Sequence, residues 1–345
     1  MPDAGRPQPR LLAAPDKLKG TLTAAEAAGA LAEAARTARW QADTCPLSDG
    51  GEGFAEALGA LGGQLRTTTV TGPLGTAVDG SWRLAGRLGV VESAAASGLA
   101  LVGGADGNDP MAASTRGTGE LIMAALSAGA RRVLVGVGGS ATTDGGLGAI
   151  EAIEECGGWG PVEVVVACDV RTTFIEAADC FGPQKGATAA QVHELRRRLE
   201  DLADHYGRRY GVEVTSLAGS GAAGGLAGGL AALGARLVPG FELVAATVGL
   251  DDKLVRARLV VTAEGCLDAS SWDGKVVGGV CASARRLEVE ALVVAGRVTD
   301  AGMEGAARHG AAVISLSALA GERAVSSSRE CLLEVVAEEL RRRLQ

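Results

Sequence analysis

The residues with the clearest capacity for chemistry lie between 132 and 150, in the stretch RVLVGVGGSATTDGGLGAI. Its apolar beginning has the β-branched composition of a buried strand, and Gly138, Gly139 and Ser140 follow directly. A strand that leads through a glycine loop into a helix leaves backbone N–H groups free to bind an anion, and Asp144 adds a carboxylate. Taken alone, the stretch is either an anion-binding loop or a tight strand-to-helix turn without a ligand.

Two further acidic loops have the composition of a metal or proton-transfer site. Asp49 and Glu52 lie in the glycine-rich segment PLSDGGEG (46–53). Two carboxylates this close can hold Mg²⁺ or activate a hydroxyl group, and they can equally form an Asp-Gly turn and a first-turn helix acid. The buried-strand pattern VEVVVA (162–167) ends in Cys168 and Asp169. Open α/β sheets bind ligands at this end of their strands, which makes Asp169 a candidate for chemistry.

The chain also contains two imitations of a dinucleotide-binding fingerprint. GVGGSA (136–141) follows a strand pattern, and GSGAAG (219–224) is a literal GxGxxG. The fingerprint requires a preceding strand, a following helix and an acidic residue about 20 positions further on. The first segment lacks that acid, and the second has only Glu242, within the turn-like PGFE. An NAD(P)-dependent dehydrogenase therefore stays an alternative, whereas the sequence has no GxxxxGK[ST] and is not a P-loop kinase.

Composition narrows the class of protein. The chain has 345 residues, 47% of them hydrophobic, with four Phe, four Trp and two Tyr, so two domains can form with cores built from Ala, Val and Leu. A net charge of −8 argues against nonspecific nucleic-acid binding. Seven cysteines without a CxxC pair are typical of reduced thiols in a cytoplasmic protein. No apolar run has the length of a membrane span, and residues 1–10 are expected to be a loose leader rather than a signal peptide.

Strand patterns alternate with helix patterns along the chain, which predicts an α/β architecture with mainly parallel sheets. Thr23 and Glu26 have the spacing of a capping box, at the start of a helix predicted to end at Ala38. Two later helices are predicted at 189–206 and 328–344. The predicted strands are 11–14, 67–70, 81–84, 88–91, 133–137, 162–167, 259–262, 291–295 and 312–315.

Ten segments rich in glycine, hydroxyl and charged residues follow one another along the chain. They are APDKLKGTLTAAEAA (14–28), PLSDGGEG (46–53), GPLGTAV (72–78), ESAAASGLALV (92–102), STRGTGELI (114–122), GVGGSATTDGG (136–146), ACDV (167–170), FGPQKGAT (181–188), GSGAAGGLAGGL (219–230) and TAEGCLD…GK (262–275). As an ordered set they resemble the bacterial glycerate 2-kinase family over nearly the whole chain. No single segment is decisive, but the order is specific.

The resemblance implies two α/β domains, one flavodoxin-like and one restriction-endonuclease-like, one inserted in the other, with the active site in the cleft. We expect residues 1–60 and 285–345 to form the first domain and residues 61–284 the inserted one. The resemblance also implies transfer of the ATP γ-phosphoryl group to the 2-hydroxyl of D-glycerate, with Mg²⁺. We therefore expect a cytoplasmic enzyme acting on a small hydroxy acid, without nucleic-acid or membrane partners, and a homodimer is compatible with this.

Phosphoryl transfer depends on positioning and charge neutralisation, which suggests a role for each loop of the resemblance. Asp169 is the favoured proton acceptor, because a carboxylate at a strand end is rigidly held, and the other expected catalytic residues are Asp49 and Lys19. The residues expected to bind the nucleotide are Gly138, Gly139, Ser140, Gly221, Gly224 and Lys275. Those expected to bind the acceptor substrate are Lys185, Thr118, Glu264 and Asp268, and the expected Mg²⁺ ligands are Asp144 and Asp169.

The chain departs from the family pattern at would-be ligand loops. TAEGCLDASS has Cys266 where an arginine is usual and Ser270 where a glutamine is usual, and a cysteine cannot replace a bidentate guanidinium. After ACDV, the usual NPL is replaced by 171–174 (RTTF). The segment between Gly148 and Val162 is shorter, which is expected to remove a surface excursion near the glycine loop. These changes leave open a kinase with an altered acceptor and a catalytically weak or regulatory paralogue.

Overall fold

Two compact units divide the chain, which a computed structural model describes over residues 8–345. The first unit contains the N-terminal segment up to Asp49, Glu56–Ala60 and Phe241–Gln345, and the second contains Gly50–Ala55 and Leu61–Gly240. The chain thus returns to the first unit at Phe241 and not at the expected residue 285. The reason is strand pairing, because the strand at residues 259–267 lies in the first unit's sheet. Residues 1–7 of the expected leader lie outside the described part.

The sheet of the first unit has the strand order β11-β10-β9-β1-β2, and every neighbouring pair in it is parallel. This confirms the parallel α/β prediction for this unit. Its strands are β1 (Arg10–Ala13), β2 (Gln41–Thr44), β9 (Leu259–Leu267), β10 (Glu290–Val298) and β11 (Ala312–Ser315).

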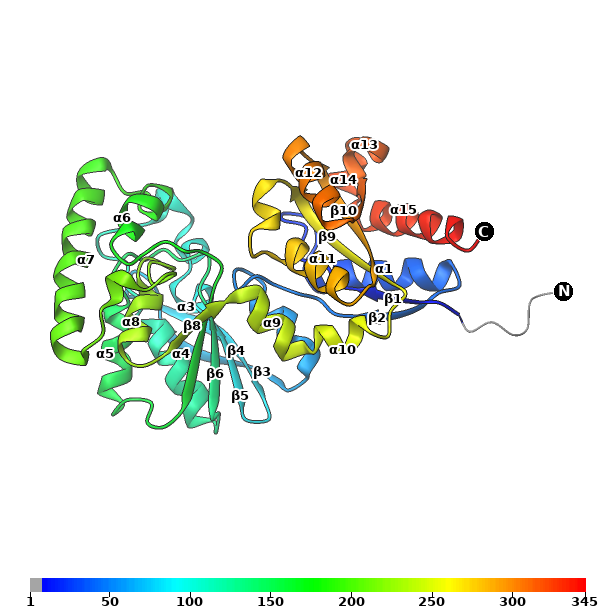
Figure 1. The fold of residues 1–345 in the computed structure, drawn as a ribbon. Coiled ribbons are helices and arrows are strands. Elements are labelled where there is room, and N and C mark those ends of the chain that lie inside the picture. Colours follow the sequence, from blue (N-terminus) through cyan, green and yellow to red (C-terminus); the bar gives the residue numbers. More distant parts are fainter. Residues whose placement is uncertain (1–7) are drawn as a thin grey trace. The chain divides into compact units, whose positions relative to one another are not determined.

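Helices cover both faces of this sheet, as the continuous apolar composition of its central strands requires. One core joins alternate residues of β1, β9 and β10 to two helices that lie side by side, drawn blue and red in Figure 1. These are α1 (Ala24–Thr37) and α15 (Ser328–Arg342). The other helices of the unit are α9 (Gly240–Val248, whose first residue belongs to the second unit), α10 (Leu250–Leu254), α11 (Val276–Arg286), α12 (Asp300–His309), α13 (Leu316–Ala320) and α14 (Arg323–Ser326), with the 3₁₀ turn η6 (Ala269–Trp272).

The sequence signals for α1 are confirmed. The Thr23 hydroxyl accepts from the backbone N–H of Glu26 at 3.2 Å, and the Glu26 carboxylate accepts from the backbone N–H of Thr23 at 2.9 Å. This reciprocal pair satisfies two of the donors that a helix start leaves open.

The sheet of the second unit has the order β3-β4-β5-β6-β7-β8. The β3–β4 and β4–β5 pairs are antiparallel, and the remaining pairs from β5 to β8 are parallel. Its strands are β3 (Gln64–Thr71), β4 (Ala77–Ala85), β5 (Leu88–Glu92), β6 (Arg132–Gly136), β7 (Glu163–Cys168) and β8 (Arg236–Pro239). The sheet is therefore mixed, with a parallel half that carries the candidate loops.

The long helix α7 packs against α6 and α8 of this unit (Figure 1). The helices here are α3 (Ala94–Ser97), α4 (Arg116–Ser127), α5 (Leu147–Glu155), α6 (Glu176–Phe181), α7 (Ala189–Tyr210) and α8 (Leu226–Ala232). The 3₁₀ turns are η2 (Leu99–Val102), η3 (Ala105–Gly107), η4 (Pro183–Lys185) and η5 (Val214–Ser216). Helix α2 (Phe54–Ala57) and turn η1 (Leu58–Leu61) lie where the chain passes between the units.

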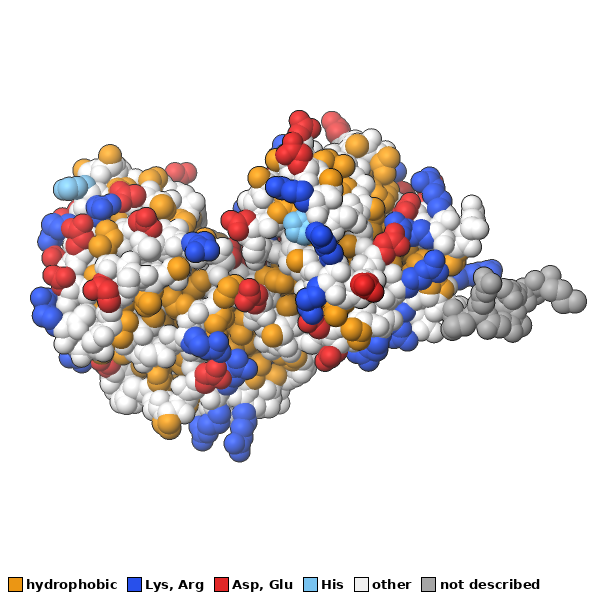
Figure 2. Space-filling view, in the orientation of Figure 1, with side chains coloured by type: hydrophobic (Ala, Val, Ile, Leu, Met, Phe, Trp, Pro, Cys, Tyr) orange, Lys and Arg blue, Asp and Glu red, His pale blue; other side chains and the backbone are white. Residues whose placement is uncertain are grey.

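Within residues 8–345, no helix combines the length and the apolar composition needed to cross a bilayer. All seven cysteines lie in this part of the chain and are free thiols. Basic and acidic side chains are interspersed on the face shown in Figure 2.

Candidate functional site

Two acidic side chains meet at the carboxyl edge of the first unit's sheet. Asp16 follows β1, and its backbone N–H donates to the carbonyl of Ala263 in β9 at 2.9 Å, which places it beside Glu264. Because β1 and β9 are parallel neighbours, their carboxyl ends share one edge of the sheet. Oε1 of Glu264 is buried and has no hydrogen-bond partner among residues 8–345. A buried carboxylate oxygen left open at this edge is positioned to meet a ligand.

The electrostatics of this pair favour proton exchange near neutral pH. Burial raises the pKa of Asp16 to about 6, with Lys17 opposing the shift and Asp49 adding to it. Burial also raises the pKa of Glu264 to about 7; the charge of Asp16 adds to this shift, and Lys275 opposes it. A carboxyl group with its pKa near the working pH is suited to accept and release a proton.

A polar rim continues from this pair along the loop after β9. The Asp268 carboxylate accepts from the backbone N–H and the hydroxyl of Ser270, at 2.8 and 2.7 Å. These hydrogen bonds from Ser270 lower the pKa of Asp268. Lys275 Nζ donates to the Ser270 hydroxyl at 2.9 Å. Ser270 therefore links the predicted acceptor-binding Asp268 to the predicted nucleotide-binding Lys275.

In the second unit, the glycine loop after β6 holds a buried lysine. Lys185 is only 3% exposed, and its Nζ donates to the Ser140 hydroxyl at 2.9 Å and to the Thr142 carbonyl at 2.6 Å. The Asn108 amide binds the two segments together, because its Nδ2 donates to the carbonyls of Lys185 and Ala141 at 2.9 and 3.0 Å. The structure thus brings together Lys185 and Ser140, which are predicted to bind substrate and nucleotide.

Burial lowers the pKa of Lys185 to about 7, against the opposing charge of Asp144. The unfolded chain keeps this proton up to about pH 10.4. The unfolded state therefore binds more protons between these two pKa values, and the free energy of unfolding should rise with pH across that interval. We expect Lys185→Met to lose this rise in urea titrations at pH values between about 7 and 10.

The control for this experiment is Lys253→Met, in the half-buried surface helix α10, which should keep the wild-type slope. An unchanged slope in Lys185→Met would contradict the prediction and show that Lys185 does not titrate in this range.

Asp144, a predicted Mg²⁺ ligand, accepts hydrogen bonds from several groups of the protein. Its Oδ2 accepts from the backbone N–H and the hydroxyl of Thr115, both at 2.8 Å, and from the backbone N–H of Gly148 at 3.3 Å. Its Oδ1 accepts from the backbone N–H of Gly146 at 3.1 Å. Burial raises the pKa of this carboxyl. Both oxygens are engaged by protein donors that tie the glycine loop to the starts of α4 and α5, so the arrangement does not support Asp144 as a Mg²⁺ ligand.

Thr118, a predicted acceptor-binding residue, contacts other polar groups of the second unit. Its side chain is fully buried in α4, and its hydroxyl lies 2.8 Å from the Ser97 hydroxyl and 3.4 Å from the Ser93 carbonyl. Through its contact with Ser97, the Thr118 hydroxyl joins α4 to α3.

The second glycine segment packs against the first. The backbone N–H of Gly145 donates to the carbonyl of Gly224 at 3.0 Å. A Cβ at Gly224, which has φ +68°, would lie 1.9 Å from the Thr142 carbonyl oxygen, and one at Gly221 would lie 2.3 Å from the Thr173 carbonyl oxygen. Close approach of two loops therefore accounts for both glycines without a nucleotide.

The same geometry corrects the dinucleotide interpretation. GSGAAG follows the 3₁₀ turn η5 instead of a strand, and GVGGSA is separated from α5 by the segment that ends at Gly146. Neither segment has the strand–turn–helix context that the fingerprint requires.

The other predicted residues lie at or near strand ends. Gly138 lies two residues after β6 and Gly139 follows it, and Asp169 comes directly after β7 with an exposed side chain. Lys19 is exposed, whereas Asp49 is 8% exposed.

Sequence reasoning missed three residues at these sites. Asp16 follows β1 and Arg297 lies at the carboxyl end of β10, on either side of β9 in the sheet, and Asn108 joins the loops around Lys185. Asp16 was detectable, because it follows a predicted strand just as Asp169 does. The other two depend on contacts between distant segments.

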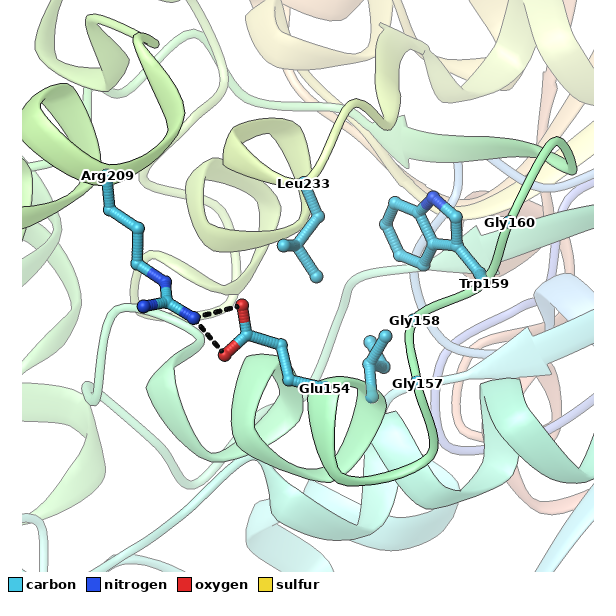
Figure 3. A pocket seen from close by; sticks show the side chains of 8 residues that line it. Glu154, Gly157, Gly158, Trp159, Gly160, Arg209 and Leu233 are labelled. Atoms are coloured by element: carbon cyan, nitrogen blue, oxygen red, sulfur yellow. Dashed lines mark hydrogen bonds and ion pairs between the residues drawn. The ribbon is translucent and has the colours of Figure 1, made fainter.

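A pocket in the second unit (Figure 3) has no residue of the glycine loop in its lining. The bidentate pair of Arg209 with Glu154, with both Nη2–O distances 2.9 Å, borders it. Its lining residues are Ile153, Glu154, Gly157, Gly158, Trp159, Gly160, Arg209 and Leu233. The connection between α5 and β7 lines this pocket and precedes the amino end of β7, whereas the glycine loop follows the carboxyl end of the parallel strand β6.

Comparison with known proteins gives one consistent family. The sequence pattern of the glycerate kinase family matches residues 11–155 and 158–345. A glycerate 2-kinase of Escherichia coli K12 is 38% identical over 328 residues, covering 84% of this chain and 86% of that protein. A glycerate kinase of Halalkalibacterium halodurans is 36% identical over 337 residues, covering 87% of this chain and 88% of that protein.

A solved structure gives the same result for the fold. It comes from Salmonella typhimurium LT2 and carries the name glycerate kinase 2. It aligns with a TM-score of 0.83 at 33% identity, covering 97% of this chain and 98% of that one.

Proposed function

Because the chain belongs to the glycerate kinase family, we propose that it transfers the γ-phosphoryl group of ATP to the 2-hydroxyl of D-glycerate or a similar small hydroxy acid. The observation that carries this proposal is the Asp16–Glu264 pair at the carboxyl edge of the first sheet, with Lys275 close enough to influence both carboxyl groups. Kinase chemistry requires a proton acceptor and fixed positive charge, and this cluster offers both.

Within this proposal, Glu264 accepts the proton of the acceptor hydroxyl. Its pKa of about 7 and its open Oε1 suit that role better than the exposed Asp169, which sequence analysis favoured. Lys275, held by Ser270, supplies positive charge toward the developing phosphoryl charge. In the second unit, Lys185 fixes the Ser140 loop and contributes positive charge for phosphate groups.

The donor set near Asp16 fits a Mg²⁺ ion that is shared with phosphates and water. No group of three or more His, Cys, Asp or Glu side chains in residues 8–345 is arranged to hold a metal by itself. Mg²⁺ commonly binds through one or two carboxylates together with substrate phosphates. The negative charge of Asp49 raises the pKa of Asp16, and a divalent cation would relieve the repulsion between the two carboxylates, so these two residues would hold it. When bound, the ion would neutralise phosphate charge.

The experiment that tests this function is an ADP-release assay across a panel of small hydroxy acids, with and without Mg²⁺. We expect ADP release with ATP and D-glycerate that depends on Mg²⁺. A catalytically weak paralogue would instead bind ATP, seen as a thermal shift, with no ADP release from any acid of the panel.

Asp169→Asn tests the predicted role of the carboxylate after β7. We expect ADP release to fall by about 10²-fold or more, since an amide neither binds Mg²⁺ as a carboxylate does nor accepts a proton. The matched control is Asp109→Asn, an exposed loop aspartate that accepts a single hydrogen bond, from the backbone N–H of Met111. Turnover near that of the wild type in Asp169→Asn would remove Asp169 from the site.

A further inference from the structure

Arg297 lies at the carboxyl end of β10, beside the acidic cluster of the first unit. In the parallel pairing of β9 with β10, Glu264 is opposite Ala295 and Cys266 is opposite Arg297. Residues two positions apart in a strand share a face of the sheet, so Glu264, Cys266 and Arg297 lie on one face. Nη2 of Arg297 is 3.5 Å from Cys266 Sγ.

The Arg297 guanidinium retains most of its donor capacity. The side chain is exposed, and among residues 8–345 no carboxylate forms an ion pair with it. Two other exposed arginines of the same unit do form ion pairs, Arg286 with Asp251 and Arg329 with Glu33. A thiol is a weak acceptor, whereas a guanidinium presents five N–H donors in a planar fork. The fork is therefore available to a planar anion arriving at this edge.

We propose that Arg297 binds the carboxylate of the hydroxy-acid acceptor and thereby selects acids over neutral alcohols. Arg297 then presents its guanidinium beside Cys266 from the neighbouring strand β10. Bidentate pairing with a carboxylate would fix the acid on the sheet face that carries Glu264, with its hydroxyl within reach of that face. This inference rests on the proposed function, and it adds a residue that the motif comparison does not contain.

The test first removes the guanidinium at position 297 and then introduces one at position 266. Arg297→Ala is expected to raise KM for D-glycerate, and its Kd by calorimetry, about 10- to 100-fold, the loss typical of a charge-assisted hydrogen-bonded pair, with KM for ATP unchanged. Arg297→Lys should recover only part of the affinity, since an ammonium cannot bind a carboxylate through a planar fork. Adding Cys266→Arg to Arg297→Ala should restore most of it, because the two positions are paired across the strands.

The matched control is Arg256→Ala, which removes an exposed arginine before the amino end of β9 and should leave both KM values unchanged. Unchanged D-glycerate affinity in Arg297→Ala would overturn the inference. So would an equal rise in KM for ATP, which would assign Arg297 to phosphate, or a defect that Cys266→Arg does not repair, which would assign it a structural role.

The two proposals fail in different ways. If the wild-type protein binds D-glycerate but releases no ADP with any acid of the panel, the proposed function falls, while the calorimetric comparison of the variants still decides the role of Arg297. If the wild-type protein binds no acid of the panel by calorimetry, both proposals are overturned.

Discussion

Glu264→Gln is expected to lower kcat for ATP-dependent phosphorylation by about 10²- to 10⁴-fold, the range typical of a lost general base. Glutamine keeps the size and polarity of the side chain but cannot accept the hydroxyl proton. The pKa of about 7 adds a second signature. Wild-type activity should rise with pH through this value, as Glu264 loses its proton, and the variant should lack that rise. Steady-state kinetics at a series of pH values measures both effects.

The matched control is Glu290→Gln, at the amino end of β10 and thus at the opposite edge of the same sheet. It should retain the wild-type kcat and pH profile, although it loses the ion pair with Arg343. A Glu264→Gln variant with wild-type kcat would exclude Glu264 as the base, and a lowered kcat with an unchanged pH profile would assign it a positioning role.

Asp144→Ala is expected to lower the free energy of unfolding by about 3–5 kcal/mol, because four protein donors lose their acceptor at once. The lost bonds hold the glycine loop against the starts of α4 and α5, so the damage falls on the core of the second unit. Urea unfolding followed by circular dichroism measures the change.

Two variants control for this loss. Asp144→Asn keeps one acceptor oxygen in the same shape and should lose less stability than alanine. Asp109→Ala removes an exposed aspartate with a single backbone hydrogen bond, and its change should stay below about 1 kcal/mol. If Asp144→Ala unfolded at the wild-type urea concentration, the hydrogen bonds to Asp144 would contribute no net stability.

Strands with continuous β-branched runs were predictable, because a strand that is buried on both faces of a parallel sheet consists of consecutive apolar residues. β2 (QADT) and β8 (RLVP) were missed, since both are short edge strands with partly exposed, mixed residues. The boundary at which the chain returns to the first unit was predicted at residue 285 instead of Phe241 for a different reason. The pairing of β9 with β1 joins residues nearly 250 positions apart, and no local pattern reports a partner at that distance.

The sequence allowed the segments of the candidate site to be predicted, but not the role of each residue within them. Glu264, Asp268 and Lys275 were identified, and the structure connects them through Ser270 and mutual charge. Asp144 and Thr118 have the same residue types as ligands do, but they use their oxygens inside the protein. Whether a polar oxygen meets a ligand or a backbone N–H depends on the packing of distant segments, which residue type alone does not encode.

The central position of β9 in the first sheet sets an order for folding during synthesis. β1 is made first, yet its neighbour β9 leaves the ribosome about 250 residues later. The residues of the second unit are synthesised between β1 and β9. This unit can therefore fold before β9 is available to pair with β1. Until β9 is synthesised, β1 and β2 form at most a two-strand ribbon, in which the edge of the apolar strand β1 that later pairs with β9 stays open. The nascent chain is therefore most exposed to aggregation through its first synthesised strand.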